Sequence, residues 1–292
     1  MTNRKLNDKK ILTVMLLLAG CSKGEQDINV AQTGSDLLVN NSAAQLKLYT
    51  FNCGDIQVTD LDLFASSGDY VGQQKHLANT CYLIRHAEGD LIWDLGLPAE
   101  LAGAGALVNG TFSLTLESTL QDQLAQIGIS AADIEFISIS HSHFDHTGQA
   151  VMFPDATWLV HQDEYQFMFS TEESKEQNSA FAVFERTEFR GDYDVFGDGL
   201  VVILEMPGHT PGHTALQLTM PESGIILLTG DLYHMSKSRK LRLVPRFNTN
   251  EAQTRESMML FESIASELGA RVIIQHEPEV VALLPKPPQF LQ

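Results

Sequence analysis

The sequence predicts an α+β fold in which helices pack outside two β-sheets. Short apolar runs bounded by Gly, Pro and polar turns occur in both halves of the chain, and such runs are typical of strands. Two segments with apolar residues three and four positions apart are typical of amphipathic helices. Because strands dominate each half and helices follow them, we expect two covered sheets. With 292 residues and 43% hydrophobic content, the chain can bury a sizeable core.

In the first half, the apolar runs 80–85 and 91–95 flank a polar, Gly-containing turn and predict a β-hairpin. Leucine and isoleucine positions four and three residues apart predict an amphipathic helix over 116–127. A buried strand is expected over 135–140. These elements alternate in type, as a sheet with an outer helix requires.

The second half begins with a short predicted strand, 157–160, and a polar and aromatic stretch, 164–194, whose helical period is weak. Pro and Gly then separate three further predicted strands, 199–205, 214–219 and 225–228. A long helix with one apolar side and a last core strand complete the chain, over 251–268 and 271–275.

The first 21 residues predict an export signal. Four cations precede the apolar run 11–19, which is too short to cross a bilayer as a helix. The sequence Leu18-Ala19-Gly20-Cys21 resembles the bacterial lipobox, in which the signal is cut before a cysteine that carries lipid. An ordinary signal with a chance cysteine is the alternative. We therefore expect an exported protein, periplasmic or extracellular, with a lipid anchor at Cys21 under the first interpretation.

Residues 22–45 are polar and without period, which predicts a flexible tether before a domain over 46–292. Removal of residues 1–21 takes away four of the 19 cations and one of the 37 anions, and leaves a formal charge of −21. Nucleic acid is not expected as a partner, because phosphate binding needs clustered Lys and Arg. An oligomer is neither predicted nor excluded.

The other two cysteines, Cys53 and Cys81, leave two interpretations open. In an oxidising compartment they could pair, and they could equally be two buried free thiols. Neither belongs to a CxxC motif or lies beside a His, so cysteine chemistry is not expected.

The segment His141-Ser142-His143-Phe144-Asp145-His146 carries the strongest chemical signal. It follows the predicted strand 135–140, and side chains two residues apart on an extended chain point the same way. His141 and His143 can therefore face one point, while the following turn directs Asp145 and His146 to a second. Imidazole suits zinc, iron and nickel, and carboxylate is a harder ligand.

Three later residues of ligand type also stand at predicted strand ends or in tight turns. His209 lies in the turn Pro207–His213, Asp231 follows the strand 225–228, and His276 follows the strand 271–275. The same placement recurs each time, which predicts that several strands deliver metal ligands to one edge of the fold.

A known family signature resembles this set in order and approximate spacing. It is the HxHxDH, H, D, H signature of the metallo-β-lactamase superfamily, matched here by HSHFDH, His209, Asp231 and His276, and the resemblance covers roughly 46–285. The resemblance implies an αββα sandwich and two divalent metal ions, with Zn²⁺ expected although iron, manganese and cobalt accept the same ligands. It implies that metal one binds His141, His143 and His209. Metal two then binds Asp145, His146 and His276, and Asp231 bridges. His213 and Asp94 are expected to support ligands.

Within the superfamily, HSHFDHTG and the continuation Thr229–His234 resemble the N-acyl-homoserine lactonase branch. This resemblance implies a hydrolase whose small-molecule substrate is a lactone, with Asp145 carrying a proton to the ring oxygen. The alternative is a broader periplasmic hydrolase of esters, β-lactams or phosphotriesters. A metal-binding surface lipoprotein without catalysis is a third hypothesis.

The chain departs from that branch at one position. Known lactonases place a catalytic tyrosine three residues after the bridging Asp, where this chain has His234, and Tyr233 comes one residue earlier. We predict that His234 contacts the substrate; a surface histidine without a role is the alternative. Phe144 is expected beside the ring or in ordinary packing. The aromatic stretch Tyr165–Phe184 either lines an acyl groove or packs a helix on the sandwich or another subunit.

Overall fold

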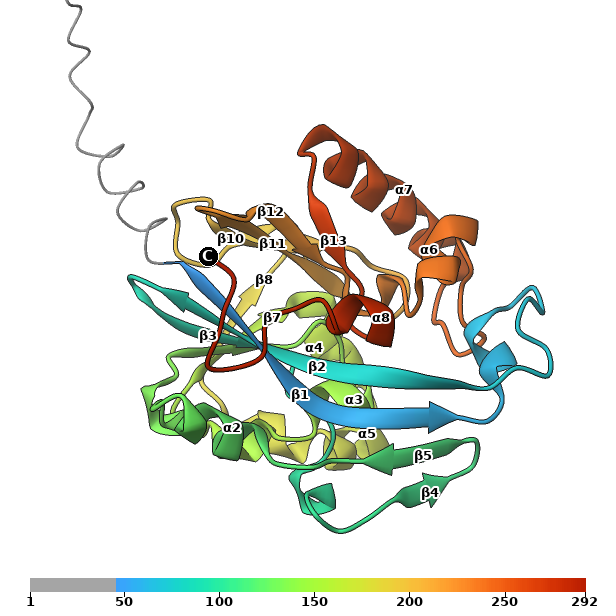
Figure 1. Ribbon diagram of the computed structural model, residues 1–292, viewed down its shortest axis with the longest axis horizontal. Helices are drawn as coiled ribbons and strands as arrows, with labels where there is room; N and C mark the ends of the chain where they lie inside the picture. The colour runs from blue at the N-terminus through green and yellow to red at the C-terminus, as the bar shows by residue number, and fades with distance from the viewer. Residues whose placement is uncertain (1–45) are drawn as a thin grey trace, which may run out of the picture.

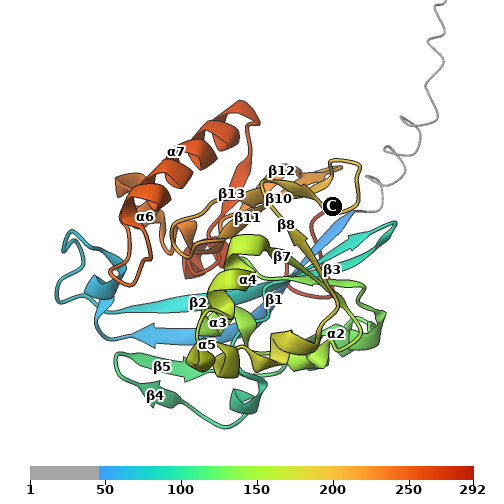
Figure 2. The same ribbon diagram turned by 180° about the vertical axis from the view of Figure 1, so that it is seen from behind.

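Two β-sheets face each other at the centre of the computed structural model, with helices on both outer sides (Figures 1 and 2). The structure describes residues 46–292. The predicted export signal, Cys21 and the predicted tether 22–45 lie outside the described residues. Among residues 46–292, no helix has the length and apolar character needed to cross a membrane.

The larger sheet has eight strands. It is antiparallel from its first edge to β3 and parallel from β3 to its other edge. In spatial order the strands are β4 (Leu107–Asn109), β5 (Phe112–Thr115), β1 (Lys47–Val58), β2 (Lys75–His86), β3 (Gly89–Trp93), β6 (Phe136–Ser138), β7 (Thr157–His161) and β8 (Arg186–Phe189).

The smaller sheet has five strands, all antiparallel to their neighbours except the parallel pair β12 and β13. In spatial order these are β13 (Arg271–Ile273), β12 (Gly224–Leu228), β11 (Thr214–Met220), β10 (Val201–Glu205) and β9 (Tyr193–Asp194).

Three apolar layers hold the sandwich together. Between the sheets, Trp93 and Leu159 of the larger sheet pack with Leu216 of the smaller one. On the outer side of the larger sheet lie α2 (Leu120–Gln126), α4 (Gln162–Met168) and α5 (Glu172–Gln177), and on that of the smaller sheet lies α7 (Glu251–Glu267). The predicted αββα sandwich is confirmed.

Shorter helices connect these layers. The α-helices are α3 (Phe144–Thr147), α6 (Ser236–Leu241) and α8 (Pro278–Val281). The 3₁₀ helices are η1 (Leu61–Phe64), η2 (Ala99–Leu101), η3 (Ala131–Asp133), η4 (Ala150–Met152), η5 (Ser179–Val183) and η6 (Gly230–Leu232).

The hairpin β2–β3, the later core strands and the long helix α7 were predicted from the sequence and are confirmed. The predicted helix 116–127 was wrong at its start. Helix α2 begins at Leu120, because Thr119 caps it: its side chain accepts from the Asp122 N–H, and the Asp122 side chain accepts from the Thr119 N–H. The stretch 164–194, whose helical period was weak, contains most of α4 together with α5, β8 and β9. Sequence reasoning missed β1, β4 and β5.

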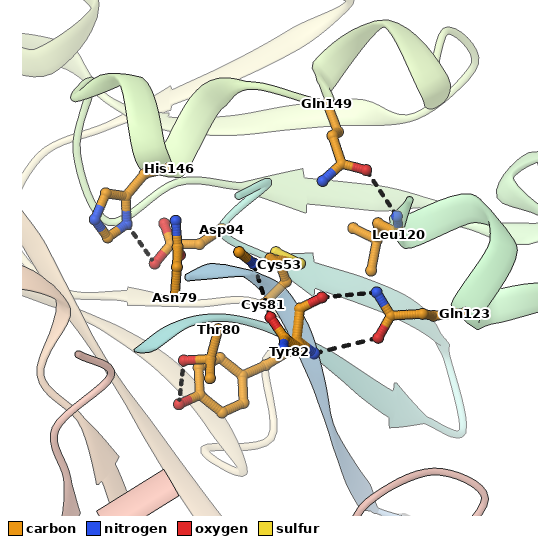
Figure 3. The surroundings of a disulfide bond; sticks show 12 residues. Cys53, Asn79, Thr80, Cys81, Tyr82, Asp94, Leu120, Gln123, His146 and Gln149 are labelled. Carbon is orange, nitrogen blue, oxygen red and sulfur yellow. Dashed lines mark hydrogen bonds and ion pairs between the residues drawn. A yellow bond between two sulfur atoms is a disulfide. The ribbon is translucent and has the colours of Figure 1, made fainter. Parts of the chain in front are cut away.

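Cys53 and Cys81 form a disulfide bond between the neighbouring strands β1 and β2, which decides the alternative that the sequence left open (Figure 3). Both residues are fully buried. A Cβ atom on Gly96 would lie 2.4 Å from the Cys53 Cβ, and Gly96 has a φ of 64°. The turn that carries Asp94 therefore packs directly against the disulfide.

Candidate metal centre

Four strand ends bring the predicted ligands to one edge of the sandwich. The segment 141–146 follows β6 and runs into α3, whose N-cap is His143. His209 comes from the β10–β11 connection, Asp231 lies in η6 after β12, and His276 follows β13. Four of the histidines are almost completely buried, namely His141, His146, His209 and His276.

The ligand atoms gather in two groups. One contains His141, His143, His209 and Asp231, and the other contains Asp145, His146 and His276. Within each group the ligand atoms lie within 4.8 Å of one another. The structure thus brings together all seven residues that the resemblance implied, with Asp231 among the ligands of the first group.

In the first group, three ring nitrogens converge. His143 Nδ1 is 2.8 Å from His141 Nε2 and 3.1 Å from His209 Nε2. Asp231 Oδ2 lies 3.4 Å from both Nε2 atoms. This arrangement offers three imidazole nitrogens and one carboxylate oxygen to a single point.

In the second group, His146 Nε2 and His276 Nε2 are 3.3 Å apart. Asp145 Oδ2 lies 3.8 Å from the first and 3.6 Å from the second. The other oxygen of Asp231, Oδ1, is 3.4 Å from His146 Nε2 and 2.9 Å from His276 Nε2. Since its two oxygens face different groups, Asp231 has the geometry of a bridging ligand.

The hydrogen bonds behind the rings show that the site fits cations. His146 Nδ1 lies 3.0 Å from Asp94 Oδ2, and His276 Nδ1 lies 2.7 Å from the Ala78 carbonyl oxygen. In a neutral ring Nδ1 then holds the proton, and Nε2 presents a lone pair. Both lone pairs point towards Asp231 Oδ1, which is buried without a hydrogen-bond donor. Divalent cations would satisfy these electron-rich atoms.

The electrostatics favour the same interpretation. Burial holds the pKa of His141 and of His143 well below the ordinary value, as neutral ligands require. Burial also lowers the pKa of His146, but the carboxylates of Asp94, Asp145 and Asp231 outweigh it and raise that pKa well above its usual range. The buried carboxylates therefore favour positive charge at the second ligand group.

Asp94 supports the second group, as the resemblance implied. Its Oδ1 accepts from the Ser140 N–H at 2.6 Å, and its Oδ2 accepts from Gln275 Nε2 at 2.7 Å. The same Oδ2 also accepts from His146 Nδ1 (Figure 3). The residue is fully buried and has a φ of 62°, which L residues seldom adopt. The surrounding hydrogen bonds hold it in that conformation and orient the His146 ring.

His213 is a supporting residue and not a ligand in this geometry. Its Nδ1 lies 2.9 Å from the Met206 carbonyl oxygen, and its Nε2 accepts from the Asp231 N–H at 3.0 Å. Burial lowers its pKa to about 3, so the ring is neutral. Both ring nitrogens are used, and the second one holds the backbone of the bridging residue.

His234 and Tyr233 point to different places. Tyr233 is fully buried among apolar residues beneath α7, where its ring packs against Phe261. His234 Nε2 lies 2.9 Å from Asp231 Oδ2, and its ring stacks on that of His276 with an interplanar angle of 13°. Its predicted contact with substrate stays a prediction, but the ring lies at the metal centre and not on the surface.

A cavity of about 350 Å³ opens onto the ligand cluster. His143, Asp145, Asp231, His234 and His276 form its polar end. Its apolar walls are Ile56, Leu63, Phe64, Leu77, Phe112, Phe144 and Phe247. Phe144 therefore lines the cavity beside the ligand cluster, and its predicted contact with a lactone ring stays a prediction.

The aromatic stretch Tyr165–Phe184 does not line this cavity. Phe181 and Phe184 are buried in the core between the larger sheet and its helices, with Tyr165 and Phe169 packed against them. Of the two interpretations, packing on the sandwich is correct. Phe64 and Phe247, which do line the cavity, lie in connections that the sequence pattern did not distinguish.

Sequence reasoning also missed residues that orient the ligands. Asn248 Oδ1 lies 3.2 Å from His209 Nδ1, and Asn79 Nδ2 donates to the Asp145 carbonyl oxygen at 2.8 Å. Gln275, the neighbour of His276, donates to Asp94. Only Gln275 stood beside a recognised ligand; the others had no signal in the linear sequence.

The family model for the metallo-beta-lactamase superfamily matches residues 76–264. The chain belongs to this superfamily. Among the relatives of this chain is N-acyl homoserine lactonase AttM of Azorhizobium caulinodans, 26% identical over 260 residues, which are 84% of this chain and 98% of the relative. N-acyl homoserine lactonase AiiA of Bacillus thuringiensis subsp. kurstaki is 31% identical over 170 residues, which are 55% of this chain and 66% of the relative.

A solved structure of an N-acyl homoserine lactone hydrolase, with the product N-hexanoyl-L-homoserine bound at its catalytic metal center, superimposes with a TM-score of 0.74 and 25% identity. The match covers 85% of this chain and 99% of that one. The fold and the metal-binding character of the site therefore agree with the family.

Proposed function

We propose that the chain hydrolyses the lactone ring of N-acyl-homoserine lactones. The observation that carries the proposal is the junction of two ligand groups with one apolar cavity, lined by Phe64, Phe112, Phe144 and Phe247. A lactone ring at the polar end would leave its acyl chain against those walls. Relatives named N-acyl homoserine lactonase, aligned over most of the chain, support the same substrate class.

The chemistry follows from the residues at the polar end. Water adds across the bond between the carbonyl carbon and the ring oxygen, so that the carbon gains a hydroxyl group and the ring oxygen gains a proton. Two divalent cations held by the ligand groups would activate that water near neutral pH. Asp145, which borders the cavity, accepts the proton from the water and passes it to the ring oxygen. The product is the N-acyl-homoserine.

His234 completes the polar end. Its ring borders the cavity and its Nε2 contacts the bridging carboxylate of Asp231. A ring in this position can direct a hydrogen bond at the substrate oxygen once cations take up the carboxylate. His234 would thereby take the role of the tyrosine that stands at the same position in the lactonases that this chain resembles.

The experiment compares substrates on one preparation of metal-loaded protein. Ring opening of N-acyl-homoserine lactones is measured by the release of protons. We expect it to be faster than hydrolysis of a chromogenic cephalosporin, a p-nitrophenyl ester or a phosphotriester. Faster turnover of the cephalosporin would replace this proposal by the broader hydrolase. Bound metal without turnover of any of the four would indicate a binding protein.

Zinc, export and the lipid anchor belong to the same proposal. The donor set of imidazoles and carboxylates suits Zn²⁺, and metal analysis after expression in zinc-limited and zinc-replete medium tests it.

The disulfide between Cys53 and Cys81 supports an oxidising compartment, periplasmic or extracellular. Cys21 is the residue that would carry lipid. Mass spectrometry of the N-terminal peptide from the native host distinguishes lipidation at Cys21 from simple cleavage.

A further inference from the structure

One buried carboxylate near the metal centre takes no part in the proposed hydrolysis. Glu164 is the third residue of α4 and is 1% exposed. It belongs to neither ligand group and does not line the cavity. A carboxylate is costly to bury unless hydrogen bonds satisfy it, and its partners therefore indicate what it does.

The two oxygens of Glu164 reach two different loops. Oε1 accepts from the Ser142 N–H at 2.8 Å, and Ser142 stands between the ligands His141 and His143. Oε2 accepts from the Thr210 hydroxyl at 2.7 Å and from the Gly212 N–H at 3.0 Å. Thr210 directly follows the third ligand of the same group, His209. One side chain thus joins the two loops that carry every histidine of the first ligand group.

The approach of the second loop to α4 is close enough to restrict its sequence. A Cβ atom on Gly212 would lie 2.2 Å from the Glu164 backbone nitrogen, so a residue with a side chain does not fit there. Although Asp145 and His146 follow on the same segment as Ser142, the second ligand group has further contacts of its own. Asn79 Nδ2 donates to the Asp145 carbonyl oxygen, and His276 Nδ1 contacts the Ala78 carbonyl oxygen.

We infer that Glu164 is a positioning residue for metal one, setting the distance between the His141-Ser142-His143 loop and His209 while leaving the second ligand group to its own supports. This inference rests on the proposed metal centre but not on the proposed lactone substrate. Residues behind the ligands of a metal site typically change metal affinity by about 10- to 100-fold. Loss of Glu164 should therefore weaken one of the two binding steps selectively.

The test measures metal affinity of the full chain. Apo-protein is titrated with Co²⁺, and the visible absorption of bound Co²⁺ reports binding. A second titration uses Zn²⁺ in competition with a chelator. The two steps are assigned with His209→Ala and His276→Ala, which each remove a ligand of one group. Glu164→Gln keeps the shape but leaves one acceptor oxygen for two loops. We expect the step at the first group to weaken by about tenfold or more and the other to stay unchanged.

Glu135→Gln is the matched control. Glu135 also accepts a backbone N–H, that of Asp90, at the opposite end of β3 and β6, and its substitution should change neither step. Thr210→Val removes one arm of the link, and Thr210→Ser restores it. These two variants carry the test if Glu164→Gln does not fold, and the backbone bond from Thr214 N–H to the Ser140 carbonyl oxygen keeps the loops paired in them.

The metal affinities of these variants distinguish a selective effect on the first ligand group from a general one. Selective weakening in Glu164→Gln and Thr210→Val, with recovery in Thr210→Ser, supports the inference. Equal affinities in all variants, or equal weakening of both steps, overturn it. Because the readout is metal binding, the result does not depend on which ester or lactone the protein hydrolyses.

Discussion

His234 Nε2 lies 2.9 Å from Asp231 Oδ2, which joins the residue that departs from the lactonase pattern to the candidate bridging ligand. Replacement of His234 by Ala removes a ring that borders the cavity but leaves all seven candidate ligands in place. We expect turnover to fall by about 100-fold, the scale of a lost proton-transfer or hydrogen-bonding group, with metal content near two per chain. Steady-state kinetics and metal analysis on the same sample check this.

Tyr233→Phe is the control for His234. The Tyr233 ring packs beneath α7, so removal of its hydroxyl should leave turnover unchanged. If Tyr233→Phe lost activity while His234→Ala kept it, the roles assigned to the two neighbours would be reversed.

Asp231→Ala should behave differently, because Asp231 offers one oxygen to each ligand group. Without it, the imidazoles of both groups lose their shared negative partner. We expect metal content to fall below two per chain after gel filtration, and turnover to be lost with it. Metal retained at two equivalents would show that Asp231 does not bridge.

The disulfide should contribute strongly to stability. Cys53 and Cys81 are 28 residues apart, and closing a loop of that length stabilises the folded state by roughly 3.5 kcal/mol through the unfolded chain. Urea unfolding of the wild type should therefore shift to a lower midpoint when reductant is present. In Cys53→Ala/Cys81→Ala the midpoint should already be low, and reductant should not move it. A wild-type midpoint that ignores reductant would contradict the pairing in solution.

Phe247 should influence the preferred acyl length. It lines the cavity and is 40% exposed, so its loss removes apolar contact without opening the core. For Phe247→Ala we expect kcat/KM to fall roughly tenfold more for long-chain than for short-chain lactones. Phe167 on α4 is 39% exposed and lies outside the cavity, and Phe167→Ala should leave the chain-length profile unchanged. Parallel losses for both variants would remove the cavity from substrate selection.

The ligands could be predicted because metal chemistry restricts residue type and spacing. His141, His143, Asp145 and His146 lie within six residues, and His209, Asp231 and His276 each follow or lie between strands that the apolar pattern made visible. Burial of strands and helix faces is written into local periodicity, which is why the αββα layers were also predictable.

The sequence alone could not decide the contacts made between distant segments. Whether Cys53 meets Cys81 depends on the register of β1 against β2, and β1 itself was not predicted. Part of the cavity wall comes from Phe64 and Phe247, far apart in the chain, whereas the more conspicuous aromatic stretch 165–184 is core. Glu164 gains its meaning only when α4 packs against two loops. Such long-range packing has no local period, and only the tertiary structure determines it.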